Sequence, residues 1–275
     1  MPGWTGMRLA GQPTWSEVAD VHGPAPSPLT VVLVHGAFAD ASSWAGVTGL
    51  LHGDGLTVHA PANPLRGLAH DAACLRNVLR RIDVPVVLVG HGYGGAVITD
   101  AAADADNVLA LCYVAAFGLD AGECLLDITS RFSPTPAADA LFGAPVPTPF
   151  PADADSELSI RRELFPQVYA ADLSPHVTSV LSVTQRPIAR CALTSRSGPP
   201  AWADKPSWYA VATADRMLNP TAQRFMALRM TATTHSLEGS HAVPRSQPDA
   251  VAAMIREAAA HSVGPDSGRT PRHPF

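Results

Sequence analysis

Residues 86–103, VVLVGHGYGGAVITDAAA, decide the fold. An apolar run typical of a buried strand leads directly into a glycine-rich turn and then into an alanine-rich helical segment. The glycines at 90, 92 and 94 have the spacing of the strand–turn–helix motif G-x-S-x-G, in which a serine at positive φ is the nucleophile. The central residue here is Gly92. The position predicted to carry the nucleophile therefore has no side chain.

The segments on either side of this motif alternate between short apolar runs and amphipathic stretches. Strands are predicted at residues 30–34, 56–59, 85–89, 108–115, 207–212 and 231–237. Helices are predicted at residues 69–82, 95–105, 220–230 and 246–260, the last with Ser246 as its N-cap. This alternation predicts an α/β fold with a mostly parallel sheet and helices on both faces.

Residues 120–200 interrupt the alternation. Prolines crowd residues 134–151, and short helical pieces are predicted at 156–165 and 176–193. We expect this insertion to form a cap over the carboxyl edge of the sheet, where parallel sheets bind ligands. A peripheral insertion with its own packing is the alternative. The predicted domain spans residues 29–260, after an N-terminal extension over 1–28 and before a disordered tail over 261–275.

Chemistry-bearing residues follow the predicted strands. The segment VVLVHGAFADASSW (31–44) has a His-Gly pair after its strand, and Asp215 follows the strand at 207–212. His241 lies between the last predicted strand and the last helix. Asp120, after the strand at 108–115, competes with Asp215 as the acid, and Asp215 has the alternative role of bracing its own loop beside Arg216.

In this order and spacing, the motifs resemble those of the α/β-hydrolase superfamily over about residues 29–260. They are most similar to the small esterases related to plant hydroxynitrile lyases and methyl-ester esterases. The resemblance implies that His241 is the catalytic base and Asp215 its acid partner, with the backbone amides of Ala37 and Tyr93 forming an oxyanion hole around Gly92.

Other polar residues near these motifs receive structural roles. His35 and His91 belong to the two turns, and we expect them to be hydrogen-bonding neighbours of the site. Ser42 and Ser43 are expected to cap the helix that begins near Trp44, a surrogate nucleophile role for Ser43 being the alternative. The glycine-rich turn could also cradle the phosphates of a dinucleotide, but that interpretation leaves Asp215 and His241 unexplained.

Glycine at residue 92 excludes an acyl-enzyme, because it has no atom that attacks a carbonyl. Three hypotheses remain. The protein acts non-covalently with His241 and Asp215 as general base, it is a binding protein that lost the chemistry, or it is a serine esterase whose serine was replaced. The cap residues predict a small or medium-sized apolar carbonyl or ester ligand, through Phe132, Leu141, Phe142, Phe150, Phe165 and Tyr169.

Composition restricts the class of protein. The chain has 275 residues, 47% of them hydrophobic and 16% charged, with a formal net charge of −5. These values indicate a folded protein and argue against nucleic acid or membrane as a partner. The scattered residues Cys74, Cys112, Cys124 and Cys191, with a poor secretion signal, predict a reduced, cytoplasmic protein. No motif predicts a metal or another cofactor.

Overall fold

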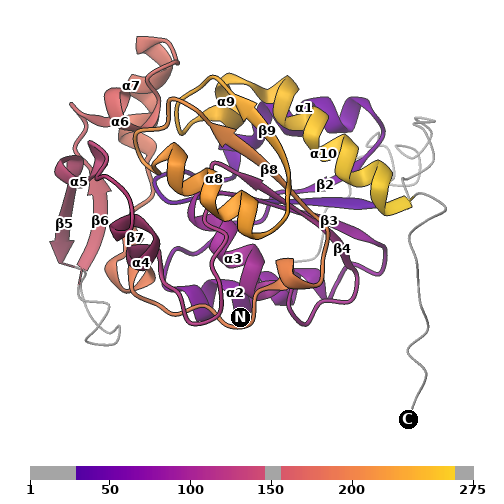
Figure 1. Ribbon diagram of the computed structural model, residues 1–275. Helices are drawn as coiled ribbons and strands as arrows, with labels where there is room; N and C mark the ends of the chain where they lie inside the picture. Colours follow the sequence, from indigo (N-terminus) through magenta and orange to yellow (C-terminus); the bar gives the residue numbers. More distant parts are fainter. Residues whose placement is uncertain (1–28, 146–155, 264–275) are drawn as a thin grey trace, which may run out of the picture.

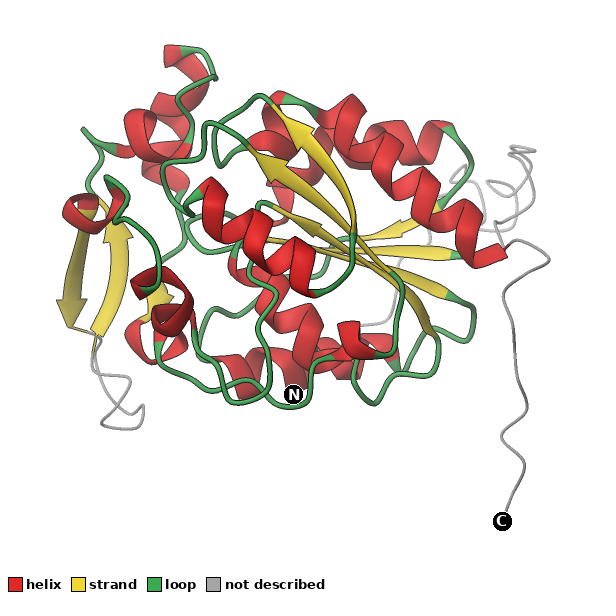
Figure 2. Ribbon diagram, viewed as in Figure 1, coloured by secondary structure: helices red, strands yellow, loops and turns green. Residues whose placement is uncertain are grey.

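The computed structural model describes residues 29–145 and 156–263. Its main sheet has six strands in these ranges, all parallel, in the order β2-β1-β3-β4-β8-β9 (Figures 1 and 2). The strands are β1 Thr30–Val34, β2 Thr57–His59, β3 Val86–His91, β4 Val108–Val114, β8 Ser207–Ala212 and β9 Thr233–Leu237. This architecture confirms the predicted parallel α/β fold.

Helices bury both faces of the main sheet. On one face lie α1 (Ala45–Gly53) and α10 (Pro248–Val263), and on the other lie α2 (Leu68–Leu79), α3 (Tyr93–Ala101) and α8 (Pro220–Arg229). Burial on both faces explains the continuous apolar sequence of the central strands, because successive side chains point to opposite sides. In the described ranges, every helix is too short or too polar to cross a lipid bilayer.

The chain between β4 and β8 builds a separate layer at one end of the main sheet (Figure 1). It contains a three-stranded antiparallel sheet in the order β5-β6-β7. In chain order its elements are α4 Leu125–Ser130, α5 Ala137–Ala140, β5 Leu141–Pro145, β6 Ser156–Ile160, α6 Phe165–Tyr169, α7 Pro175–Thr184, β7 Ile188–Ala189, η3 Arg190–Leu193 and η4 Ala201–Ala203. We call residues 120–200 the cap, as defined from the sequence.

Part of the predicted cap structure is wrong. Residues 156–165 do not form one helical piece, because Ser156–Ile160 is strand β6 and the short α6 begins only at Phe165. The reason is visible in the burial of β6, where Leu158 and Ile160 are buried and their neighbours are less so. This alternation has the period of a strand. The helix predicted from residue 176 is present as α7, and η3 follows the short β7.

Two predicted helix caps are also wrong. Asp40, not Ser42 or Ser43, caps the turn η1 (Ala41–Trp44), and its Oδ1 accepts a hydrogen bond of 2.8 Å from the Ser42 amide. A carboxylate is the stronger acceptor at this position. Ser246 ends the short helix α9 (Val243–Ser246) instead of capping the next one, which begins at Pro248.

The predicted domain boundaries agree only partly with the helices. Helix α10 continues to Val263, past the boundary expected at residue 260. The predicted N-terminal extension (1–28) and the tail from residue 264 lie outside the described residues.

Candidate active site

Gly92 occupies the turn between β3 and α3. Its backbone angles are φ +53° and ψ −121°, a conformation that side chains rarely adopt. The Gly92 amide donates to the Val114 carbonyl at 3.2 Å, and its carbonyl accepts from the Phe117 amide at 3.0 Å. Hydrogen bonds to the β4 end of the sheet thus fix the turn in place, as expected for a strand–turn–helix motif at positive φ.

The neighbouring glycines permit close packing around this turn. A Cβ added to Gly90 would lie 2.6 Å from the Gly94 carbonyl oxygen. A Cβ added to Gly94 would lie 2.5 Å from the carbonyl oxygen of Val34 in β1. Both distances are shorter than van der Waals contact with rigid backbone atoms. Only glycine allows β1, β3 and the start of α3 to approach so closely.

His241 and Asp215 form a buried hydrogen-bonded pair. His241 precedes α9, Asp215 follows β8, and the His241 Nδ1 lies 2.7 Å from Asp215 Oδ2. The two side chains are 7% and 0% exposed. Because a carboxylate can only accept, Nδ1 carries the proton, and the lone pair of the neutral ring is on Nε2. Asp215 thus selects the tautomer that leaves Nε2 free to accept a proton.

Further donors hold the Asp215 carboxylate. Its Oδ1 accepts from the amides of Met217 and Leu218 at 2.7 and 3.0 Å, and its Oδ2 accepts from Gln223 Nε2 at 2.8 Å. Gln223 is completely buried in α8, and its Oε1 accepts from the Ala212 amide. Asp215 therefore binds His241 and also braces its loop. The sequence does not reveal the role of Gln223, because one glutamine in an amphipathic helix carries no recognisable motif.

The structure brings His241 directly against Gly92. A Cβ added to Gly92 would lie 3.0 Å from His241 Nε2 and 3.4 Å from Cε1. The free nitrogen of the ring thus points at the space that a side chain at residue 92 would occupy. This contact is tighter than side chains normally accept, so His241 packs closer to residue 92 than a Cβ would allow.

Ala37 and Tyr93 lie beside Gly92 on the wall of one cavity. Among the described residues, neither of their amide N–H groups has a hydrogen-bond partner. The Tyr93 hydroxyl donates to Asp71 Oδ2 at 2.8 Å. Burial raises the pKa of Tyr93 well above its usual value, and the nearby Asp71 carboxylate raises it further. The tyrosine hydroxyl therefore keeps its proton and anchors the residue that follows Gly92.

His91 contacts His241 from the strand side. Its Nε2 lies 2.8 Å from the His241 carbonyl oxygen, and the two rings are 4.6 Å apart. A carbonyl only accepts, so His91 Nε2 carries the proton. Burial, together with the adjacent His241, holds the pKa of His91 well below its ordinary value. His91 is therefore a neutral donor that fixes the His241 backbone.

His35 braces the other turn. Its Nε2 accepts from the Asn63 amide at 2.9 Å, and its Nδ1 donates to the Gly36 carbonyl at 2.9 Å. Burial lowers the pKa of His35, and the Gly36 bond opposes that effect without reversing it. Since both nitrogens have partners and His35 does not line the cavity at Gly92, this residue is a brace of the loop before Ala37.

The cavity over Gly92 has a volume of about 470 Å³. The main domain contributes Gly92, Tyr93 and His241, and the cap contributes apolar side chains from α4, β5, β6 and β7. The insertion therefore covers the carboxyl edge of the sheet, where the turn at Gly92 lies. The peripheral alternative for the cap does not agree with this arrangement.

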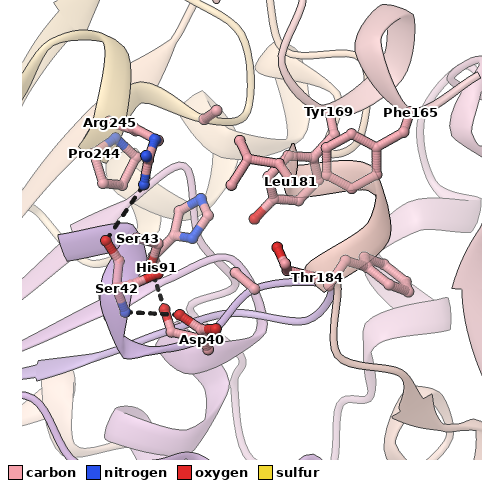
Figure 3. Close-up of a pocket in the computed structure, with 13 residues that line it drawn as sticks. Asp40, Ser42, Ser43, His91, Phe165, Tyr169, Leu181, Thr184, Pro244 and Arg245 are labelled. Atoms are coloured by element: carbon pink, nitrogen blue, oxygen red, sulfur yellow. Dashed lines mark hydrogen bonds between the residues drawn. The ribbon is translucent and has the colours of Figure 1, made fainter. Parts of the chain in front are cut away.

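A second, smaller cavity of about 30 Å³ lies on the other side of His91. Figure 3 shows the ring of His91 and the hydroxyl of Tyr169 turned toward this space, with Asp40 and Ser43 on its wall. The Ser43 hydroxyl donates to the Asp40 carbonyl at 2.7 Å. Ser43 lines this smaller cavity and not the one at Gly92, so the structure does not place it as a surrogate nucleophile.

The cap residues named from the sequence are dispersed. Leu141 lines the cavity at Gly92, whereas Phe165 and Tyr169 line the smaller one. The Phe132 ring packs 5.7 Å from Phe225 on α8. Phe142 is largely exposed, and Phe150 lies outside the described residues.

Asp120 is not brought to the site. Its Oδ1 accepts from the Ala121 amide at 2.7 Å, and the residue does not line the cavity. The acid that reaches His241 is Asp215. Within the described ranges, no three His, Cys, Asp or Glu side chains gather as metal ligands.

Comparisons with known proteins agree with this fold. The sequence pattern of the Alpha/beta hydrolase family matches residues 31–254. No curated protein matches the chain.

Three solved structures illustrate the likeness. Polyneuridine aldehyde esterase superimposes with a TM-score of 0.72 at 16% identity, covering 84% of this chain and 98% of the other. A methylesterase from Arabidopsis, MES16, gives 0.69 at 20%, covering 85% and 99%. A pyrethroid hydrolase from Sphingobium faniae JZ-2 gives 0.66 at 23%, covering 83% and 96%. At these identities the likeness shows a shared fold.

Proposed function

Because this chain belongs to the alpha/beta hydrolase family, we propose that it acts on a small or medium-sized carbonyl or ester compound by non-covalent general acid–base chemistry. His241 is the base, Asp215 orients it, and Gly92 replaces the usual nucleophile. The observation that carries this proposal is the position of His241 Nε2, 3.0 Å from where a side chain at Gly92 would begin. In this position the ring nitrogen can accept a proton from a molecule that occupies the space in front of Gly92.

The proposed mechanism needs no covalent intermediate. A water molecule, or a hydroxyl of the substrate, occupies the space in front of Gly92 and gives its proton to Nε2 of His241 as its oxygen bonds to the carbonyl carbon. The resulting imidazolium is stabilised by the Asp215 carboxylate at Nδ1. In an ester, the bond from that carbon to the alcohol oxygen then breaks, and the imidazolium of His241 returns the proton to the leaving alkoxide. The amides of Ala37 and Tyr93, which have no hydrogen-bond partner among the described residues, act as the oxyanion hole for the negative charge that develops on the carbonyl oxygen.

The expected rate enhancement is modest. General base catalysis contributes about 10²–10⁴-fold. Serine proteases without a triad member retain roughly 10³–10⁴-fold over water through the oxyanion hole and binding. Hydrolysis and cyclisation use a proton transfer from water or a hydroxyl to His241, whereas elimination and isomerisation next to a carbonyl use transfer of a C–H or hydroxyl proton to the same base. The esterases and the pyrethroid hydrolase with which the chain shares its fold support an ester or a related carbonyl compound as the substrate.

Variants of the pair test this function in a p-nitrophenyl acetate assay. We expect His241→Ala to lower turnover by about 100-fold or more, and Asp215→Asn by at least about tenfold through the wrong tautomer. His235→Ala is the matched control, because His235 also pairs with a carboxylate, Glu257, at 3.0 Å, but outside the cavity. An inactive wild-type chain, or turnover unchanged by His241→Ala, contradicts the proposal.

A further inference from the structure

The cavity over Gly92 is uncharged. None of the described residues that line it is Asp, Glu, Lys or Arg. The titratable side chains on its wall are His241 and Tyr93, and the tyrosine is held in its neutral form. Moving an ion from water into such surroundings without a partner is strongly unfavourable. A molecule that fills this cavity is therefore neutral.

The size of the cavity limits the size of its occupant. Its volume is about 470 Å³. An apolar protein cavity of about 150 Å³ binds benzene, so this one accommodates roughly three such rings. Volumes in this range are typical of pockets that bind small organic molecules.

Apart from Tyr93 and His241, the polar side chains of the cavity wall belong to one stretch of the cap and to the residue that precedes α8. They are Thr129, Ser130, Ser133, Thr135 and Asn219. The hydroxyls of Thr129, Ser130 and Thr135 already donate to backbone carbonyls at 3.3, 3.1 and 3.1 Å. Their oxygens remain available only as acceptors. By contrast, the strands β5, β6 and β7 contribute only apolar side chains.

We propose that this cavity binds a neutral, mainly apolar molecule of about three-ring size, with its carbonyl at Gly92 and hydroxyl or N–H donors facing the Thr129–Thr135 stretch. The inference rests on the proposed function only in taking this cavity as the working site. To the proposed function it adds the size of the ligand, its lack of charge, and a donor edge, by which we mean the side of the ligand whose hydroxyl or N–H groups face the Thr129–Thr135 stretch.

Calorimetric titration of the wild-type chain with aryl methyl ketones tests the size and charge. Ketones are not hydrolysed, so binding is measured without turnover. Through acetophenone, acetonaphthone and acetylphenanthrene, we expect affinity to rise about fivefold or more per ring. Phenanthrenecarboxylate should bind at least about 100-fold more weakly than the ketone of the same ring number. Equal binding of the carboxylate, or tightest binding of the single-ring ketone, overturns the inference.

A pair of threonine variants tests the donor edge. Acetylnaphthol carries a hydroxyl that acetonaphthone lacks, and we expect Thr129→Val to remove the affinity gained from it, about tenfold. Thr194→Val is the control, since Thr194 is exposed and makes the same kind of backbone bond, to the Cys191 carbonyl at 3.2 Å. An unchanged preference for acetylnaphthol in Thr129→Val overturns the donor edge. If the ketones bind while the matching esters are not turned over, the proposed chemistry fails and the ligand class stands.

A separate observation concerns the loop that carries His241. The residues on both sides of His241 are hydrogen-bonded to the cap. The Ser240 amide donates to Asp172 Oδ2 at 3.0 Å, and the Ser240 hydroxyl lies 2.5 Å from Asp172 Oδ1. The Ala242 amide donates to the Tyr169 carbonyl at 3.1 Å. The cap therefore holds this loop directly.

The close approach of Asp172 depends on the residue before Ser240. A Cβ on Gly239 would lie 2.9 Å from Asp172 Oδ2, so any other residue would displace the carboxylate. The Tyr169 ring also packs edge-on against the His241 ring at 5.1 Å. From the sheet side, the His241 backbone receives the bond from His91 already described. The base is thus held between β3 and the end of α6.

From these contacts we infer that Asp172 is a positioning residue for His241, so that docking of the cap and placement of the base are coupled. Asp172 does not line the cavity at Gly92. It acts through its hydrogen bonds to the Ser240 amide and hydroxyl, which fix the backbone position from which His241 extends.

The test is the low-field proton resonance of the His241–Asp215 hydrogen bond, with amide exchange of the His241 loop. We expect Asp172→Ala to broaden or remove this resonance and to speed exchange of the Ser240 amide by about tenfold or more. Asp172→Asn keeps one acceptor oxygen and should retain most of the signal. Glu163→Ala, an exposed acid of the cap, is the control. A lower Tm in Asp172→Ala with an unchanged resonance would mean an ordinary structural role and overturns the inference.

Discussion

Replacing Gly92 with serine introduces a hydroxyl in front of His241, and we expect this substitution to lower the stability of the protein. At φ +53° a serine backbone is strained by roughly 1–3 kcal/mol. About 0.4–1 kcal/mol of this loss is offset, because the unfolded chain has less conformational entropy with serine than with glycine. The new Cβ would lie 3.0 Å from His241 Nε2, so the ring must move by a few tenths of an ångström. We therefore expect a net loss of roughly 0.5–2 kcal/mol, which lowers Tm by about 1–6 °C.

The same substitution should create covalent chemistry. On the proposed function, stopped-flow mixing of Gly92→Ser with p-nitrophenyl acetate should give a burst of nitrophenolate, because the proposed base and the two proposed oxyanion-hole amides already adjoin residue 92. Gly92→Ala is the matched variant, with the same strain and no hydroxyl. It should melt like the serine variant and show no burst. Gly122→Ala is a control for backbone strain alone, because Gly122 has φ +75° and an added Cβ would meet no other atom of the described residues. Any loss of Tm in Gly92→Ala beyond that in Gly122→Ala is then due to crowding of His241.

Two results would refute this reasoning. A higher Tm in both Gly92 variants would mean that the turn does not impose the strain we assign to it. A serine variant that melts as expected but gives no burst would mean that His241, Asp215 and the amides are not arranged for acyl transfer.

Three further predictions follow from the packing of the site, each measured by urea unfolding. Gly94→Ala should cost about 3 kcal/mol or more, because its Cβ would lie 2.5 Å from the Val34 carbonyl; a smaller loss contradicts the close packing. Gln223→Leu should cost about 2–4 kcal/mol by leaving buried groups unpaired, including one donor bond to Asp215; a neutral effect would be contrary to that network. The pKa of His91 is lowered in the folded protein, so its contribution to the free energy of unfolding is complete above the unfolded pKa of about 6.5 and is lost as the pH falls below that value. His91→Gln should therefore reduce the slope of unfolding free energy against pH in this acidic range by up to about 1.4 kcal/mol per pH unit. An unchanged slope would show that His91 is not the cause of this pH dependence.

The sequence was sufficient to predict the architecture, because its signals are local. The apolar run at residues 86–89, followed by glycines at 90, 92 and 94, allows little else than a buried parallel strand entering a tight turn. The order of Gly92, Asp215 and His241 then placed three distant segments at one edge of the sheet. The hydrogen bond between His241 and Asp215 agrees with this placement.

What the sequence did not reveal depends on contacts between distant segments. Gln223 supports Asp215 from α8, and Asp172 supports the His241 loop from the cap, yet both are ordinary polar residues in their local sequence. The sequence of β6 predicts a helix, because a strand of five residues with two buried positions is too short for its period of 2 to be told from the period of 3.6 of a helix. The N-cap of the turn at Ala41–Trp44 was likewise assigned to the wrong residue, because Asp40 competes there with Ser42 and Ser43.

Intact-mass measurement during turnover of p-nitrophenyl acetate tests whether the site at Gly92 works without a covalent intermediate. We expect the wild-type chain to release nitrophenolate while its mass stays unchanged, and His241→Ala to abolish the release. A mass increase of one acetyl group on the wild-type chain, located on a residue of the cavity at Gly92, would contradict this expectation.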